Sequence, residues 1–182
     1  MPVISSHKDP SSLTLTIVSE HDADVARVWQ IWEDPRQLER WWGPPTWPAT
    51  FDQHELVPGS RSTYYMTGPE GEKAGGWWKI LSVDAPRTFE FEDGFADDGQ
   101  GVPTTDTTRA VVTLEEVGSA GSAGSADGGD GSDGATSAGG RTRMTIVTTF
   151  ASLEHLDALV TMGMEEGMRE AMSQIDAVLT GS

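Results

Sequence analysis

Five or six β-rich runs follow one another along the middle of the chain, and a single long amphipathic helix pattern comes after the last of them. Turn-forming segments such as "VPGS", "GPEGE" and "DAPR" separate neighbouring runs. Short connections between consecutive strands produce an antiparallel meander, because parallel strands need longer crossovers. One face of such a sheet must be covered, and the last helix is the element available. The runs occupy residues 46–56, 61–67, 75–84, 87–93, 109–117 and 141–150.

The preceding part of the chain predicts one strand and two short helices. Residues 12–19, "SLTLTIVS", alternate and are rich in β-branched residues, as in a strand. Asp22 is a good N-cap for a helix and Asp24 suits its positive end, while Pro35 starts a second helix that "GPP" at 43–45 stops. The element order predicts an α+β domain. The first of the two helices is predicted by apolar residues that recur at helical spacing: Val25, Val28, Trp29 and Trp32.

The composition is that of a single globular domain. A chain of 182 residues can bury a real core, and we expect one domain over residues 12–180. The net charge of −17 repels phosphate backbones and anionic lipid heads, so we expect no nucleic-acid partner and no membrane partner. Cysteine is absent, and neither a membrane span nor a secretory signal is visible, so a cytoplasmic location is expected.

Residues 118–140 are nearly all Gly, Ser, Ala and Asp, a composition that cannot form a core. Because they lie between two convincing strands, we interpret them as a disordered insertion in a hairpin. Asp127, Asp130 and Asp133 invite a calcium interpretation, but their spacing differs from the EF-hand pattern and no downstream Glu completes it. We therefore predict no metal site.

The closing helix pattern, residues 153–179, contains two glycines one turn apart, although glycine costs a helix about 1 kcal/mol relative to alanine. Ser152 is a plausible N-cap, and Gly181 lies just beyond the end. On a helical wheel, small residues at four-residue steps form one ridge and methionines form its neighbour. The two ridges are Gly163, Gly167 and Ala171, and Met164, Met168 and Met172.

Two interpretations of this helix face are open. The glycines could let the helix backbone approach the sheet closely, with the methionines filling an irregular gap. Alternatively, the small residues leave an opening that the methionines line for varied apolar ligands. Met162 falls on the polar side of the wheel, which indicates either an exposed side chain or a bend near Gly163.

Two long blocks of the chain resemble the START-like (SRPBCC) superfamily, in particular the branch of domains homologous to the activator of the heat-shock-chaperone ATPase. These blocks are "VWQIWEDPRQLERWWGPP" at 28–45 and the closing segment at 148–179, and the hairpins at 57–72 and 83–91 are compatible. The resemblance implies the helix-grip fold: a curved antiparallel sheet of about seven strands around a long C-terminal helix, with two short N-terminal helices and a cavity between sheet and helix.

In such a fold the helix face and the concave sheet would line the cavity, and the corner at 41–43 would lie near its mouth. The face of each strand is uncertain by one residue, and a slip by one residue inverts it. Our candidate ligand-binding residues are Trp41, Trp42, Tyr65, Trp78, Phe91, Met144, Ile146, Met164, Gly167 and Met168.

We assign no catalytic residue and no cofactor from the sequence. His54 lies in a strand near Asp52, and such a pair could orient a general base, although a polar strand surface is the more common explanation. Acidic residues in the last helix fall on its charged side: Glu165, Glu166 and Glu170. Arginines in two adjacent strands could receive a carboxylated ligand or pair with Glu115 or Glu116: Arg109, Arg141 and Arg143.

Three functions compete. The first is binding of a small apolar or aromatic molecule in the cavity without catalysis, which the resemblance and the soft helix face favour. The second is a cyclase-like or hydrolase-like enzyme of the same superfamily. The third is a domain that stimulates a chaperone ATPase, but we do not expect a chaperone partner, because the additional N-terminal domain of the full activator is not seen in the sequence. A homodimer is compatible with all three.

Overall fold

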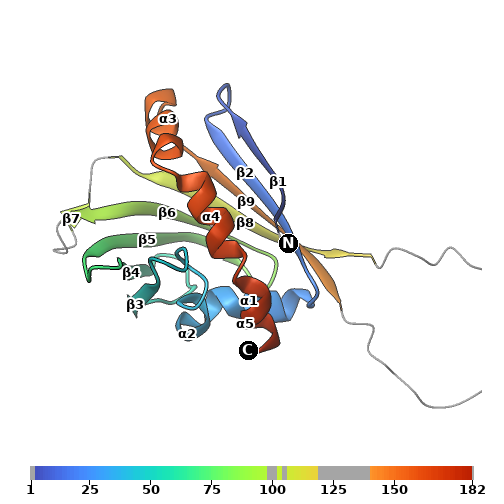
Figure 1. Cartoon of the computed structure of the whole chain (residues 1–182). Helices are drawn as coiled ribbons and strands as arrows, with labels where there is room; N and C mark the ends of the chain where they lie inside the picture. Colours follow the sequence, from blue (N-terminus) through green and yellow to red (C-terminus); the bar gives the residue numbers. More distant parts are fainter. Residues whose placement is uncertain (1–2, 98–101, 104–105, 119–139, 182) are drawn as a thin grey trace, which may run out of the picture.

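The computed structural model describes residues 3–97, 102–103, 106–118 and 140–181, and it shows an α+β domain (Figure 1). The strands are β1 Val3–Asp9, β2 Thr14–His21, β3 Ala49–Gln53, β4 Arg61–Thr67, β5 Lys73–Asp84, β6 Thr88–Asp97, β7 Val102–Pro103, β8 Thr108–Val117 and β9 Arg141–Thr149. They form one antiparallel sheet in the order β1-β2-β9-β8-β6-β5-β4-β3, with β7 paired to β6. The sheet curves around the C-terminal helical segment, which confirms the predicted helix-grip architecture (Figure 1).

Two short helices, α1 Val25–Glu33 and α2 Pro35–Leu38, connect β2 to β3. The N-cap of α1 is Asp24, and its carboxylate accepts a hydrogen bond from the backbone N–H of Arg27 at 2.7 Å. This corrects the expectation that Asp22 is the cap: β2 continues to His21, so the chain needs the next residues to turn away from the sheet. Pro35 is the first residue of α2, as predicted.

Strand β1 is an element that the sequence pattern did not predict, and it lies before the expected domain start at residue 12. Its segment, "VISSHKD", is polar and lacks regular alternation. The strand is the edge of the sheet and pairs along β2 from Val3 opposite Ser19 to Asp9 opposite Thr14. An edge strand needs no buried face of its own, so its sequence carries little hydrophobic signal.

The C-terminal segment is three helices, where the sequence predicted one unbroken helix. They are α3 Leu153–Thr161, α4 Met164–Met172 and α5 Ile175–Thr180. The first break lies at Gly163, whose φ of +95° is a left-handed conformation that ends a right-handed helix. The predicted ends are confirmed: the Ser152 hydroxyl accepts a hydrogen bond from the backbone N–H of His155, and Gly181 is left-handed with φ +75°.

The hydrophobic core occupies the concave side of the sheet and centres on Trp32 of α1, which is fully buried. Ring centroids of Trp41, Phe89 and Trp42 lie 4.6, 5.1 and 5.9 Å from that of Trp32. Offset and edge-to-face aromatic pairs each contribute beyond the area that they bury. This aromatic cluster fills the end of the sheet next to α1 and α2.

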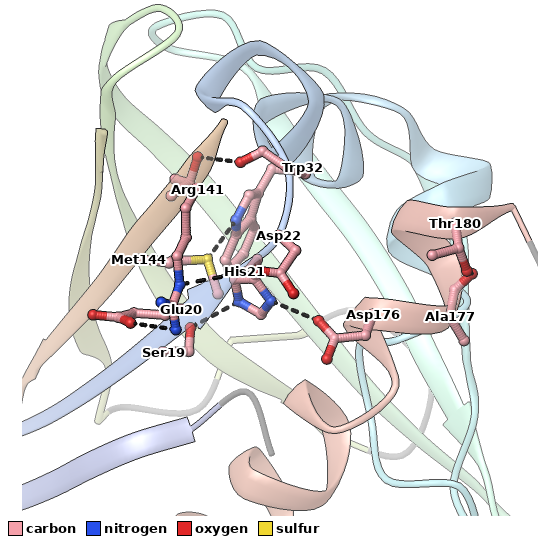
Figure 2. A network of polar contacts seen from close by, with 12 residues as sticks. Ser19, Glu20, His21, Asp22, Trp32, Arg141, Met144, Asp176, Ala177 and Thr180 are labelled. Atoms are coloured by element: carbon pink, nitrogen blue, oxygen red, sulfur yellow. Dashed lines mark hydrogen bonds and ion pairs between the residues drawn. The ribbon is translucent and has the colours of Figure 1, made fainter. Parts of the chain in front are cut away.

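A partly buried polar network fixes α5 against β2 (Figure 2). His21 has a fully buried side chain; its Nδ1 lies 3.1 Å from Asp176 Oδ1, and its Nε2 lies 2.9 Å from Ser19 Oγ. A carboxylate only accepts, so Nδ1 carries the hydrogen and the Ser19 hydroxyl donates to Nε2 of the neutral ring. Burial lowers the pKa of His21, partly opposed by Asp176. The imidazole therefore works as a neutral connector between sheet and helix.

The predicted insertion lies between β8 and β9, which pair as antiparallel neighbours from Arg109 opposite Thr149 to Val117 opposite Arg141. The expected hairpin is therefore present. Residues 119–139, including Asp127, Asp130 and Asp133, lie outside the described residues. Within the described ranges, no helix combines the length and apolar character needed to cross a membrane.

Candidate ligand-binding cavity

A cavity of about 270 Å³ lies between the concave face of the sheet and helices α3 and α4. Alternate strand residues form its floor, and the segment from Trp42 to Pro44 forms part of its wall. Phe95 and Met162 lie at its rim, where their side chains are 52% and 77% exposed. The floor residues are Tyr64, Phe91, Asp93, Thr108, Ala110 and Ile146.

The structure decides the question of the two glycines. Apart from its chain neighbours and its own helix backbone, a methyl group added at Gly167 or at Gly163 would have no heavy atom within 4 Å, so neither glycine permits a close approach between helix and sheet. Gly167 lines the cavity instead, between the half-buried side chains of Met164 and Met168. Gly163 serves the break between α3 and α4, and Met162 is both exposed and adjacent to that break. The close-approach interpretation is wrong, and the open-face interpretation describes the geometry.

Part of the candidate set lies in the wall of the cavity. These residues come from the loop after α2, from two strands and from α4, so the fold brings together segments that are distant in sequence. They are Trp42, Phe91, Ile146, Met164, Gly167 and Met168.

Four other candidates do not line the cavity. Trp41 is fully buried behind it, where its Nε1–H donates to the carbonyl of Ile31 at 3.1 Å. Met144 is fully buried too, and its sulfur accepts from Trp32 Nε1 at 3.2 Å. Trp78 lies beneath the wall, with ring centroids 4.8 Å from Trp42 and 4.4 Å from Phe91. These three support the lining residues from behind.

The fourth candidate, Tyr65, lies on the opposite face of β4 from the one predicted. Tyr64 and not Tyr65 faces the concave side, because Ser62 and Tyr64 are the buried positions of β4. Tyr65 is on the outer face, where Lys73 Nζ lies 4.2 Å from its ring centroid. A slip by one residue exchanges the two faces of a strand, and two adjacent tyrosines carry no signal that separates them.

Several lining residues were missed by sequence reasoning, most importantly Asp93. Phe91 was a candidate, and strand alternation from Phe91 leads to Asp93 and then Phe95 on the same face. The signal was therefore present, but an aspartate is usually placed on the solvent side. Others that were missed include Trp32, Pro44, Tyr64, Met66 and Leu159, whereas Gly43 belongs to the corner that was expected near the mouth.

Asp93 and Tyr64 form a polar pair within this largely apolar cavity. The Tyr64 hydroxyl donates to Asp93 Oδ1 across 3.5 Å, a long distance for such a bond. The carboxyl is accessible from the cavity but is otherwise surrounded by protein, and this burial raises its pKa to about 7. Burial also raises the pKa of Tyr64, with a further contribution from Asp93. A carboxyl that is partly protonated near neutral pH can donate a hydrogen bond as well as accept one.

The histidine hypothesis does not fit the geometry. His54 contacts Ser62 Oγ through Nδ1 at 2.8 Å and the carbonyl of Trp32 through Nε2 at 2.7 Å, and Asp52 is exposed. Since a carbonyl only accepts, Nε2 carries the hydrogen and Nδ1 accepts from Ser62. Burial lowers the pKa of His54. The ring connects α1 to β4 as a neutral structural group. The described part of the chain contains no cluster of three or more His, Cys, Asp or Glu that could hold a metal.

The arginines lie outside the cavity and are paired. Arg109 pairs with Glu90, Arg141 with Glu20 at 2.9 Å, and Arg143 with Glu20 at 3.0 Å. Among the described residues, the ion-pair partners are thus Glu90 of β6 and Glu20 of β2, and not the expected Glu115 or Glu116. Of the helix glutamates, Glu165 accepts a hydrogen bond from Ser6 of β1 at 2.5 Å, whereas Glu166 and Glu170 are exposed.

A curved antiparallel sheet that grips a C-terminal helix, with an apolar cavity between them, defines a START-like domain. The chain belongs to the family described as activator of Hsp90 ATPase homolog 1-like protein, whose family model matches residues 22–123.

Solved structures agree with this assignment. A protein from Arthrobacter aurescens, solved by NMR, is 51% identical with a TM-score of 0.84, covering 99% of this chain and 93% of that one. A crystal structure from Mycobacterium smegmatis is 45% identical with a TM-score of 0.80, covering 100% and 99%. A protein from Staphylococcus epidermidis, 19% identical, covers 98% and 94% with a TM-score of 0.74 and shows the fold alone. No curated protein matches this chain.

Proposed function

We propose that this domain binds a small apolar or aromatic molecule in the cavity between α4 and the sheet. The observation that carries the proposal is the open space beside Gly167. At this position α4 faces the sheet without a side chain, and the space that a side chain could have filled is part of the cavity. A cavity of about 270 Å³ is close to the lower end of the size range of small-molecule sites.

The walls support an apolar ligand. Trp42 and Phe91 offer aromatic faces, and Met164 and Met168 offer flexible thioether side chains that adapt to ligands of different shape. No lysine or arginine is among the lining residues that the structure describes, so the site has no permanently cationic side chain for a carboxylate or phosphate. We do not extend the proposal to catalysis, nor to the chaperone ATPase named in the family description.

The test is binding of the neutral fluorescent probe N-phenyl-1-naphthylamine. We expect saturable binding to the wild-type chain and a loss of affinity of about tenfold or more in Gly167→Trp, because the new ring enters the space that the ligand needs. Glu166→Trp is the matched control, since it adds the same ring at the adjacent exposed position of α4. Equal affinity of both variants, or no saturable binding to the wild type, contradicts the proposal.

A further inference from the structure

We propose that Asp93 and Tyr64 are the hydrogen-bonding anchor of the cavity, and that the ligand is an apolar ring compound carrying a carbonyl oxygen. This inference rests on the proposed function and adds the chemical class of the ligand. It follows from the position of the two polar groups, from their incomplete mutual hydrogen bond and from the charge of the surroundings.

Position comes first. Tyr64 is on β4 and Asp93 is on β6, with β5 between them. The Tyr64 ring reaches across β5 because the residue opposite it there is Gly76, and a methyl at Gly76 would lie 2.5 Å from the Tyr64 hydroxyl oxygen. Both side chains line the cavity, on its floor opposite α4. The fold thus delivers a phenol and a carboxyl from different strands to one point of an apolar surface.

The two groups only partly satisfy each other. Their separation of 3.5 Å is far longer than the roughly 2.5–2.7 Å of a strong bond between a hydroxyl and a carboxylate. The indole Nε1–H groups of Trp42 and Trp78 lie close enough to Tyr64 to act against the rise in its pKa, yet neither makes a hydrogen bond of standard geometry with any described residue. A buried polar cluster of this kind is satisfied best by an additional acceptor.

The surroundings select a neutral acceptor oxygen. Burial favours the protonated Asp93, which is a donor, and the Tyr64 hydroxyl becomes a second donor to the ligand when its single hydrogen turns away from Asp93 Oδ1, which lies 3.5 Å away. An anionic ligand finds no lysine or arginine among the described lining residues and is repelled by the net charge of −17. A carbonyl oxygen has two lone pairs and can accept from both donors at once.

Binding should depend on pH through Asp93. Tyr64 of β4 faces the Asp93 carboxyl, and the residues opposite Asp93 on β5 and β8 are the uncharged Trp78 and Thr108. Two other titratable groups line the cavity: Asp106, which precedes β8, and His155 of α3. Ionisation converts the Asp93 carboxyl from donor to acceptor, so a carbonyl ligand binds more weakly at pH 8 than at pH 6. A ligand without a polar group should bind equally at both values.

The experiment compares 2-acetylnaphthalene with 2-ethylnaphthalene, which has the same ring system and lacks the oxygen, by displacement of N-phenyl-1-naphthylamine. We expect the wild type to prefer the ketone by about fivefold to tenfold at pH 6, as one hydrogen bond provides, and less at pH 8. Asp93→Leu should lose the preference for the ketone but should still bind 2-ethylnaphthalene. Asp93→Asn should keep a preference that no longer varies with pH, and Tyr64→Phe should reduce it. Asp52→Asn, which removes an exposed carboxylate of β3 that does not line the cavity, is the control and should behave as the wild type.

The outcomes separate the two proposals. Saturable binding of both compounds with equal affinity overturns the carbonyl anchor and leaves the apolar site standing. The same conclusion follows from a ketone preference that survives in Asp93→Leu, from one that is undiminished in Tyr64→Phe, or from a pH dependence that persists in Asp93→Asn. Tighter binding of 2-(aminomethyl)naphthalene than of the ketone at pH 8 identifies a cation site and also overturns the anchor. Failure of every naphthalene to bind the wild type overturns both proposals.

Discussion

The ring of Tyr64 packs directly against Gly76 on the neighbouring strand: a methyl group at Gly76 would lie 2.4 Å from the ring carbon Cζ of Tyr64. This glycine has no special backbone conformation to provide. It is required because another side chain crosses the strand at this point. The relationship holds the phenol against the floor of the cavity and directs its hydroxyl toward Asp93.

We expect Gly76→Ala to lower the free energy of unfolding by about 1–3 kcal/mol, because the new methyl group overlaps a ring that cannot move without disturbing its aromatic neighbours. Urea denaturation measures the change. In a Tyr64→Leu background the same substitution should cost much less, since the obstructing ring is gone. Equal costs in the two backgrounds would show that the contact with Tyr64 is not the cause.

The adjacent tyrosines of β4 should respond very differently to truncation. Tyr64→Ala removes a buried ring and should lower the free energy of unfolding by about 3–5 kcal/mol, as other aromatic truncations in cores do. Tyr65→Ala removes an outer-face ring whose contact is Lys73, and about 1 kcal/mol or less should be lost. Thermal unfolding of the two variants checks the register directly. A reversed order would mean that β4 presents the other face.

The two glycines of the C-terminal segment should have opposite responses to alanine. Gly167→Ala meets open space in a right-handed helix, so we expect a gain of about 0.5–1 kcal/mol in the free energy of unfolding from helix propensity. Gly163→Ala also meets open space but must adopt a φ of +95°, which costs about 1–2 kcal/mol. Because sterics are the same at both sites, the difference isolates backbone conformation. Stabilisation by both substitutions would argue that α3 and α4 can form one continuous helix.

The two buried histidines should lower the free energy of unfolding as the pH decreases below the ordinary histidine pKa of 6.5, whereas Asp93, whose pKa is raised to about 7, acts in the opposite direction as its carboxyl takes up a proton. Burial lowers the pKa values of His21 and His54 in the folded chain, so the unfolded chain takes up protons at a higher pH than the folded chain does. The contribution is present above 6.5 and is lost as the pH falls toward the folded values. A decrease in pH from 7.5 to 5.5 should destabilise the wild type relative to His21→Gln, as measured by the free energy of unfolding in urea.

Asp176→Asn tests the same site independently. The Asp176 carboxylate raises the pKa of His21 against the effect of burial, so its replacement by a neutral amide should lower that pKa further. Titration of the His21 ring protons by NMR measures the shift. An unchanged His21 titration would mean that the contact with α5 shown in Figure 2 has no electrostatic weight.

Particular elements show how far the sequence alone could be interpreted. The spacing of Trp29 and Trp32 predicted α1, and Ser152 and Gly181 predicted where the C-terminal helical segment begins and ends. β1 could not be found, because an edge strand paired on one side needs no alternating apolar pattern. The sequence also did not determine whether the helix breaks at Gly163, since glycine is compatible both with a helix and with the left-handed turn that ends one.

Local patterns therefore determined the element types, the antiparallel order of the strands and the soft face of α4, because propensity, turns and periodicity act between residues close in sequence. Which residues surround the cavity was decided only by tertiary structure. The choice of Tyr64 over Tyr65, the inward aspartate at position 93 and the withdrawal of Trp41, Trp78 and Met144 behind the wall all depend on register and on packing across strands. Those interactions join residues far apart in the chain. Because side chains alternate between the two faces of a strand, a register shift of one residue moves every side chain to the opposite face.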